Sequence, residues 1–290
     1  DCGLFQGGKY SEAYNYEPFP YSAEHVDAVF ITHAHIDHIG RLPMLYKAGF
    51  RGKIFSTPPT KDFAELLLFD SQNILKREAE REGKQAPYNS SDINRLMGLW
   101  HTIPYHRAML LGPVRVQLFN AGHILGSASI EVEVVDKGEL RVVVFSGDLG
   151  NEPSPIAKKI EQPSRAEVVV VETTYGDRSH RPRGEEDRIL EELCAQVVKT
   201  GGTLLIPAFS LERSQELLLA FDHLKKKGVV EEGLEVYLDS PMALKATAIF
   251  EKYPEYFNLA LRQHYGADDP FHFPKWELVE SVQESKPINS

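Results

Sequence analysis

Three histidines and one aspartate lie within six residues of this chain, at His33, His35, Asp37 and His38. Neutral imidazole and carboxylate groups are good ligands for zinc and similar divalent metals. In an extended segment alternate side chains share a face, so His33, His35 and Asp37 can point the same way, whereas His38 requires the chain to turn. A solvated polar loop is the alternative, but this density is unusual for a chain with 11 histidines in 290 residues. The pattern therefore predicts a metal site.

Two later polar clusters follow predicted strands and carry one potential ligand each. Residues 120–127 contain His123, and residues 146–151 contain Asp148, both beside glycines that permit tight turns. Taken alone, each of these residues is more often structural than functional. Because metal ligands commonly come from several strand ends at one sheet edge, we expect His123 and Asp148 to complete the predicted site.

The composition is that of an ordinary globular protein, with 42% hydrophobic and 26% charged residues. A net charge of -10 argues against a basic, non-specific nucleic-acid-binding surface, but it is compatible with an enzyme that holds phosphate through metals. Cys2 and Cys194 offer no disulfide framework, which favours a reducing cytoplasm. No apolar run reaches membrane-spanning length, so we expect no membrane association.

The elements that must position these residues form a β-rich first part. Apolar or alternating segments predict strands at residues 26–31, 52–56, 114–119, 130–135, 140–145 and 168–171. Helices are predicted at residues 39–48 and 92–100, with a longer helix that Thr60 caps. The four consecutive valines at 168–171 predict a strand buried on both faces.

From about Arg181 the pattern changes to alternating helices and strands. Helices are predicted at 185–199, from a cap at Ser210 to Lys227, and from 241 to 257. Strands are predicted at 203–206 and 234–238. This order predicts a parallel sheet with crossover helices. We therefore predict two domains, residues 1–182 and residues 183–290.

Several motifs together carry a family resemblance. The segment at residues 33–38, followed by Gly122-His123 and Gly147-Asp148, resembles the metallo-β-lactamase superfamily. The segments at residues 122–128, 172–176 and 239–243 look like its β-CASP branch, which comprises nucleases such as RNase J and the pre-mRNA cleavage endonuclease. The form of residues 122–127 is closer to the RNA-processing members than to the DNA-repair members.

The resemblance implies a role for each matched position. Six positions match metal ligands of the family: His33, His35, Asp37, His38, His123 and Asp148. It implies that the three histidines at 33, 35 and 123 bind one zinc ion, that Asp37 and His38 bind a second, and that Asp148 bridges both. Asp37 would also orient or deprotonate the attacking water. Asp1 would support the ligands, and Glu172 would be the family's motif A acid.

The implied fold is α/β: a metallo-β-lactamase αββα sandwich, incomplete at both ends, with an inserted β-CASP α/β domain of parallel-sheet type. We expect the family's first two strands and its C-terminal return segment, which would carry the motif B histidine, the motif C residue and the last metal-ligand histidine, to lie outside these 290 residues. His264 and His272 do not match those motifs, and we interpret them as surface or loop residues.

The function that the resemblance implies is a metal-dependent ribonuclease with two divalent ions, most simply Zn²⁺. RNA is the expected partner and DNA a less favoured one, with Arg178 and His180 as candidate phosphate contacts, although a solvated loop explains those two residues equally well. The oligomeric state is open, with a homodimer as one option. Two alternatives remain: a small-molecule metallo-hydrolase, which the second domain disfavours, and a non-catalytic RNA- or partner-binding subunit, which the filled ligand positions disfavour.

Overall fold

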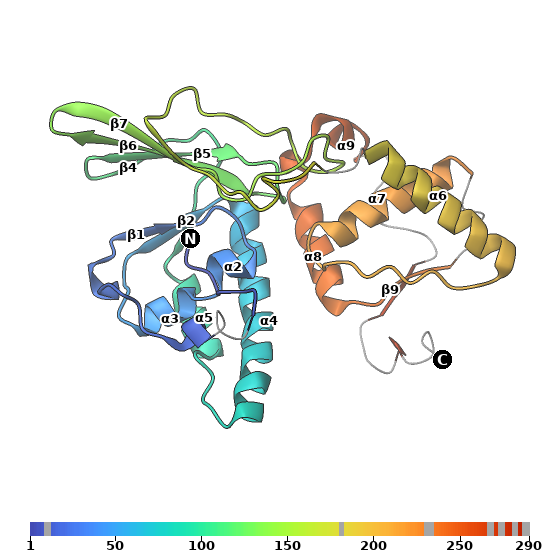
Figure 1. The fold of residues 1–290 in the computed structure, drawn as a ribbon, viewed down its shortest axis with the longest axis horizontal. Coiled ribbons are helices and arrows are strands. Elements are labelled where there is room, and N and C mark those ends of the chain that lie inside the picture. Colours follow the sequence, from blue (N-terminus) through green and yellow to red (C-terminus); the bar gives the residue numbers. More distant parts are fainter. Residues whose placement is uncertain are drawn as a thin grey trace. The chain divides into compact units, whose positions relative to one another are not determined.

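The computed structural model describes residues 1–8, 13–179, 183–228, 235–265, 270–271, 276–279 and 284–285. The chain divides into two compact units (Figure 1). Unit 1 comprises Asp1–Glu152 and Lys159–Glu172, and unit 2 comprises Pro153–Lys158 and Thr173–Ser290. The domain boundary that the sequence predicts after residue 182 stays a prediction.

Unit 1 contains two sheets. The first is parallel, with the order β1-β2-β3, and its strands are β1 (Ala28–Phe30), β2 (Lys53–Ser56) and β3 (Trp100–Thr102). The second has the order β4-β5-β6-β7-β8, and its strands are β4 (Met109–Leu111), β5 (Val114–Asn120), β6 (Ala128–Asp136), β7 (Glu139–Phe145) and β8 (Val168–Val170). Its first four strands are antiparallel, and β8 joins β7 in parallel.

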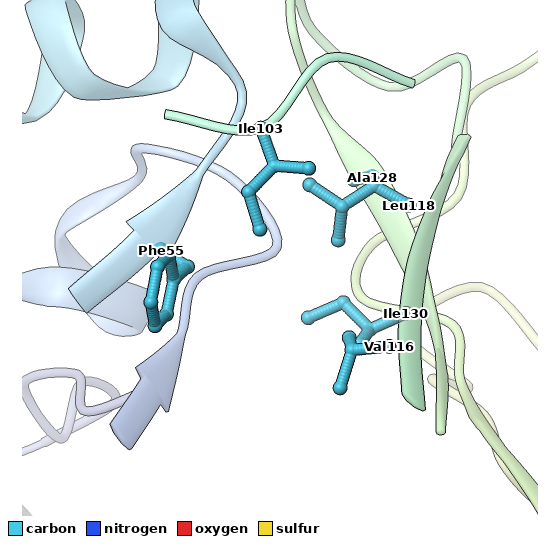
Figure 2. Packing of buried hydrophobic residues seen from close by; sticks show 6 residues of the cluster. All are labelled: Phe55, Ile103, Val116, Leu118, Ala128 and Ile130. Atoms are coloured by element: carbon cyan, nitrogen blue, oxygen red, sulfur yellow. The ribbon is translucent and has the colours of Figure 1, made fainter. Parts of the chain in front are cut away.

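The two sheets pack face to face through an apolar core (Figure 2). Alternate residues of β5 and β6 point toward the first sheet, as the period of two requires. The buried side chains of this core are Phe55, Ile103, Val116, Leu118, Ala128 and Ile130. This packing holds the ends of β1, β6 and β7 in a fixed relation, and the predicted ligands follow or flank those ends.

Helices form a further layer of unit 1. They are α2 (Ile36–Ile39), α3 (Leu42–Lys47), α4 (Pro58–Glu82) and α5 (Ser90–Met97), with the short 3₁₀ turns η1 (Tyr14–Tyr16) and η2 (Ala23–His25). In Figure 1, α3, α4 and α5 lie on the side of the first sheet away from β5–β7. Apolar residues such as Phe63 and Leu68 are fully buried in α4. The order helix, sheet, sheet agrees with three layers of the predicted sandwich.

Unit 2 follows the predicted alternation in part. Its elements are α6 (Arg183–Thr200), α7 (Arg213–Lys226), β9 (Val236–Leu238), α8 (Pro241–Lys252), η3 (Pro254–Tyr256), α9 (Leu259–His264) and β10 (Trp276–Leu278). β9 and β10 pair in parallel, as expected. Cys194, Phe221 and Leu224 form a small core between α6 and α7. Among the described residues, no helix is long and apolar enough to cross a membrane.

Two predicted helix caps are wrong. Thr57, not Thr60, occupies the N-cap of α4, and the Thr60 hydroxyl donates to the Gly126 carbonyl instead, at 3.0 Å. Ser210 does not cap α7, which begins at Arg213; its hydroxyl lies 3.2 Å from that of Ser240. In both cases a partner distant in sequence engages the hydroxyl.

Three further predictions, of one helix and two strands, also differ from the structure. The predicted helix at 92–100 is α5, which ends at Met97, so that Trp100 begins β3. The valines of β8 are not buried, since each is more than half exposed. Residues 203–206 form no strand: Leu204 and Ile206 pack on the core of unit 2 while Leu205 is 82% exposed, so side chains alternate but no strand pairs with them within the described part of the chain.

Candidate metal centre

The predicted ligands of unit 1 come from the end of β1, the start of α2 and two strand-end loops. The chain leaves β1, passes through Thr32 and His33, and enters α2 directly after His35. Asp37 and His38 therefore lie on a helical turn, which confirms the predicted turn at His38. Asp37 does not share the position of His33 and His35, because the helix carries it to the other side of the site.

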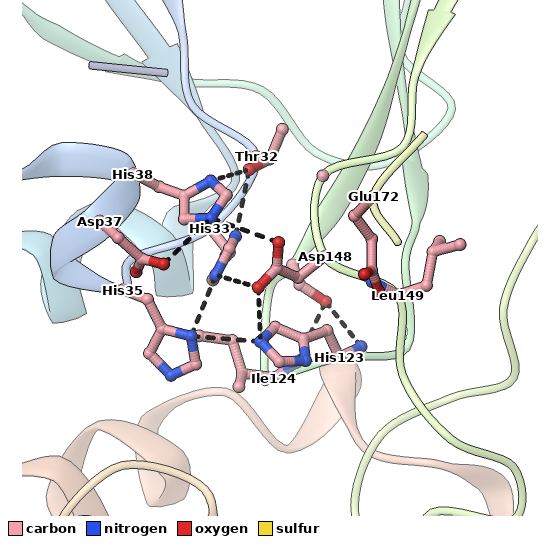
Figure 3. A network of polar contacts seen from close by, with 12 residues as sticks. Thr32, His33, His35, Asp37, His38, His123, Ile124, Asp148, Leu149 and Glu172 are labelled. Carbon is pink, nitrogen blue, oxygen red and sulfur yellow. Dashed lines mark hydrogen bonds and ion pairs between the residues drawn. The ribbon is translucent and has the colours of Figure 1, made fainter. Parts of the chain in front are cut away.

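Four ligand atoms converge on one point (Figure 3). They belong to His33, His35, His123 and Asp148 and lie within 4.8 Å of one another. His33 Nε2 is 3.0 Å from His35 Nδ1, and His35 Nδ1 is 3.1 Å from His123 Nε2. Asp148 Oδ2 closes the group at 3.8 Å from His33 Nε2 and 3.7 Å from His123 Nε2.

These separations fit a tetrahedral metal. Bonds of about 2.0–2.1 Å from zinc to nitrogen or oxygen place neighbouring ligand atoms about 3.3–3.4 Å apart. Four of the separations, at 3.0–3.8 Å, lie on either side of that value, and the whole set of atoms lies within 4.8 Å. His35 Nδ1 lies near both other ring nitrogens, but it carries either one proton or one lone pair and can pair with only one of them. A cation can instead accept a lone pair from each of the three nitrogens. The donor set therefore fits a divalent metal ion.

A second group of ligand atoms lies on the other side of Asp148. His38 Nε2 is 3.3 Å from Asp148 Oδ1 and 3.8 Å from Asp37 Oδ2. Asp148 thus presents one carboxylate oxygen to the first group and the other oxygen to the second. The side chains of Asp37 and His38 therefore lie next to the first group, with the Asp148 carboxylate between the two groups.

The protonation states suit metal binding. Burial lowers the pKa of His33 well below its ordinary value, and the nearby rings of His38 and His35 lower it further. Burial, aided by His123, lowers the pKa of His35 to about 4, and burial also lowers that of His123. The hydrogen bond from His38 lowers the pKa of Asp148. At neutral pH the three imidazoles are neutral and the carboxylate is ionised, the forms that bind metal.

Thr32 connects the supporting groups and is a residue that the sequence analysis missed. Its backbone NH and its hydroxyl both donate to the Asp1 carboxylate, each at 2.8 Å. Its hydroxyl oxygen lies 3.1 Å from His33 Nδ1, and Asp1 Oδ2 lies 2.8 Å from His38 Nδ1. A proton on His33 Nδ1 leaves His33 Nε2 with a free lone pair that faces the site, while the Asp1 carboxylate can accept a hydrogen bond from His38 Nδ1. A hydroxyl residue directly before the first histidine was the available signal.

Two close backbone approaches hold the segments together. A Cβ on Gly3 would lie 1.4 Å from the Asp37 carbonyl oxygen, so residues 1–4 press directly on α2. A Cβ on Gly150 would lie 1.6 Å from the Gly122 carbonyl oxygen, so the loop of Asp148 meets the loop of His123 in the same way. Neither position can carry a larger residue without moving a ligand.

The loop of His123 is further braced from α4 and from within. The Ser127 hydroxyl accepts from the His123 backbone NH at 3.0 Å. Thr57 and Thr60 at the start of α4 both donate to the Gly126 carbonyl, at 2.6 and 3.0 Å. The sequence assigned Thr60 only as a helix cap and gave Thr57 no role, because the carbonyl that both residues contact lies more than 60 residues away along the chain.

Of the remaining predicted site residues, only Glu172 belongs to unit 1 with the cluster. A Glu172 carboxylate oxygen accepts from the Leu149 NH at 3.3 Å, next to Asp148, and its negative charge reaches His123. Arg178 belongs to unit 2, where it is largely exposed and pairs with Asp177 at 2.9 Å. His180 lies outside the described residues.

Family models match both parts of the chain. Residues 1–144 match the metallo-β-lactamase superfamily domain, and residues 214–290 match the Beta-Casp domain. Among solved structures, the subclass B3 metallo-β-lactamase MEM-A1 from a soil metagenome aligns with 46% of this chain and 47% of its own, at 15% identity. The TM-score of 0.29 is too low for a residue-by-residue comparison.

Curated relatives extend the similarity over the whole chain. A ribonuclease of Thermus thermophilus is 36% identical over 290 residues, which are 100% of this chain and 63% of the ribonuclease. The transcription termination factor FttA of Methanosarcina mazei is 36% identical over 270 residues, which are 91% of this chain and 41% of the factor. The chain thus spans about two-fifths to three-fifths of these relatives. The chain belongs to the β-CASP branch of the metallo-β-lactamase superfamily.

Proposed function

We propose that this chain is the catalytic part of a metal-dependent ribonuclease that acts in RNA processing or degradation. The observation that carries the proposal is the convergence of His33, His35, His123 and Asp148 within 4.8 Å, with His38 on the other oxygen of Asp148. The Thermus relative bears the name ribonuclease, and the archaeal relatives bear the name transcription termination factor. Both names concern RNA, which favours RNA over DNA as the substrate.

We assign the first ion to His33, His35, His123 and Asp148 Oδ2, and the second to Asp37, His38 and Asp148 Oδ1. Zinc is the natural candidate, because imidazole and carboxylate donors at tetrahedral spacing suit it. Bound divalent ions would supply a lower pKa for water and would offset negative charge on the phosphate.

Within this site the protein's own groups have separate tasks. The Asp37 carboxylate, 45% exposed, faces solvent beside His38 and can accept a proton from an attacking water. Glu172 holds the backbone of Leu149 and thereby the loop of Asp148, so it acts first as a positioning residue. Arg178 and His180 remain candidate phosphate contacts. The two free cysteines favour a cytoplasmic protein. A homodimer is one possible assembly, and analytical ultracentrifugation would detect it.

The first prediction concerns metal and activity together. In the complete native polypeptide, His33→Ala should lower the bound metal by at least one ion per chain and reduce RNA cleavage at least 100-fold, because it removes a buried ligand. Metal is measured by elemental analysis and cleavage with a labelled oligoribonucleotide. His264→Ala, which changes an exposed histidine of unit 2, serves as the matched control and should leave both values unchanged.

Two outcomes would contradict the proposal. Hydrolysis of small esters or lactams by metal-loaded protein that leaves RNA intact would indicate a small-molecule hydrolase. Tight binding of RNA without cleavage under any divalent ion would indicate a non-catalytic binding subunit.

A second prediction concerns Thr32. Thr32→Val keeps the shape of the side chain and removes the hydroxyl that Asp1, His33 and His38 share. Loss of such a supporting group typically weakens metal affinity by about 10–100-fold. Competition with a chromogenic chelator measures this, and Thr200→Val, at an exposed hydroxyl that bonds only within its own helix end, should have no effect. Equal affinity in the Thr32 variant and the parent would refute the role given to Thr32.

A third prediction concerns the metal-free protein and pH. The pKa values of His33 and His35 are lowered on folding, that of His35 to about 4, whereas a histidine in the unfolded chain titrates near 6.5. Between about pH 6.5 and pH 4 the unfolded chain therefore binds more protons, so the free energy of unfolding falls as the pH falls through this window and is fully retained above it. Each of the two histidines lowers the free energy of unfolding by at most about 1.4 kcal/mol per pH unit in this window.

Urea unfolding in the presence of EDTA measures this slope. His35→Gln should flatten it, and His264→Gln should leave it as in the parent protein. A slope that His35→Gln does not alter would show that this buried imidazole takes up its proton as readily in the folded protein as in the unfolded chain.

A further inference from the structure

Four aromatic side chains gather beside the helix that carries Asp37 and His38. We call Phe5, Tyr14, Phe19 and Tyr21 the aromatic patch. Phe5 and Tyr14 lie 5.6 Å apart between ring centroids, and Phe19 and Tyr21 lie 5.5 Å apart. The Arg41 guanidinium links the two pairs, 5.4 Å from the Phe5 ring and 4.5 Å from the Phe19 ring. The patch is therefore one connected surface and not a set of scattered apolar residues.

The patch is unusually open for its apolar content. Phe5, Tyr14 and Tyr21 are each about half exposed, at 47%, 51% and 52%. Single exposed apolar residues are ordinary, but a contiguous exposed group usually marks a binding surface.

Hydrogen bonds hold the Phe5 backbone and the Arg41 side chain of the patch in place. The buried Asn15 side chain accepts from the Phe5 NH at 2.7 Å and donates to the Phe5 carbonyl at 2.9 Å, so it fixes that residue on both sides. Arg41 is itself only 7% exposed and donates to the Glu17 carbonyl at 2.6 Å. Such a preformed surface loses little conformational entropy when a flat ligand binds to it.

Backbone hydrogen bonds connect the segment that precedes Phe5 to the helix that carries Asp37 and His38. The Leu4 NH donates to the Ile36 carbonyl at 3.0 Å, and the Cys2 NH donates to the His38 carbonyl at 2.7 Å. Phe5 is the next residue after Leu4, and Ile36 stands between His35 and Asp37. With about 3.8 Å between successive Cα atoms, the patch begins on the order of 10 Å from the ligands.

We propose that the aromatic patch is a stacking platform for unpaired bases of the RNA, next to the phosphate that is cleaved; this rests on the proposed function. Single-stranded RNA is recognised by stacking its bases on aromatic side chains, and stacking requires no positive charge. That suits a chain with a net charge of -10, which cannot gain its affinity from a basic surface alone. Nucleobases, not the sugar-phosphate backbone, are therefore the chemical group that this surface takes.

The test is a double variant, Phe5→Leu with Tyr14→Leu, in the complete native polypeptide. Leucine keeps the apolar character and removes the aromatic face. We expect the KM for an unstructured oligoribonucleotide to rise about tenfold, the loss of roughly one stacked base, while kcat stays within about twofold. The wild-type protein should also prefer this substrate to one with abasic sites near the cleaved bond, and the double variant should lose that preference.

Two further variants calibrate the result. Phe5→Tyr with Tyr14→Phe retains both rings and should behave as the wild type. Tyr46→Leu removes a similar ring, which stacks under Arg51 at 4.3 Å at the far end of α3, and should leave KM unchanged. Thermal melting and metal content of the Leu double variant should match the wild type, because the patch touches no ligand side chain.

Binding is read independently of cleavage through the fluorescence of an oligonucleotide that carries 2-aminopurine, which stacking quenches. If the wild-type protein fails to cleave RNA with any divalent ion, the proposed function fails, whatever the probe reports. If it cleaves RNA but the Leu double variant keeps its KM and its quenching, the stacking proposal alone is overturned. Loss of metal in the Leu double variant would also overturn the stacking proposal. So would a change in its assembly state with KM retained, because that result would identify the patch as a protein interface.

Discussion

The two oxygens of Asp148 face two different groups of ligand atoms, and the rest of the site depends on that arrangement. One oxygen approaches the ring nitrogens of His33 and His123, and the other lies 3.3 Å from His38. Burial keeps the pKa values of His33 and His35 low, so these rings stay neutral and the carboxylate supplies the negative charge. Without a cation, several lone pairs would face one another in a largely buried space. Metal binding is thus the state in which these contacts become favourable.

Unit 1 is constructed so that this convergence occurs. The core between the two sheets sets the separation of β1 from β6 and β7, and the ligands follow or flank those strand ends. Backbone contacts then complete the alignment, because Gly3 and Gly150 let segments approach each other more closely than any side chain permits. Thr32 joins Asp1 to two ligand histidines and so transmits the position of residues 1–4 to the metal centre. The same residues lead directly into the aromatic patch, because Phe5 follows Leu4.

Much of the site could be predicted because its information is local. Histidines 33, 35 and 38 lie together in the sequence, and His123 and Asp148 each follow a strand pattern beside glycines. What could not be predicted depends on partners far along the chain. Thr60 has the residue type of a helix cap, but a carbonyl 66 residues away engages its hydroxyl. The four valines predicted a strand buried on both faces, but the valines of β8 are exposed. Composition alone does not tell which neighbours cover a strand. The role of Thr32 depends on the approach of Asp1, which only the folded structure reveals.

The proposal that two ions share Asp148 is tested most directly by anomalous X-ray diffraction at the zinc edge from crystals of the metal-loaded protein. We expect two peaks about 3.5–4 Å apart, one bound by His33, His35 and His123 and the other by Asp37 and His38, with one oxygen of Asp148 on each. A single peak, or two peaks of which only one touches Asp148, would contradict it.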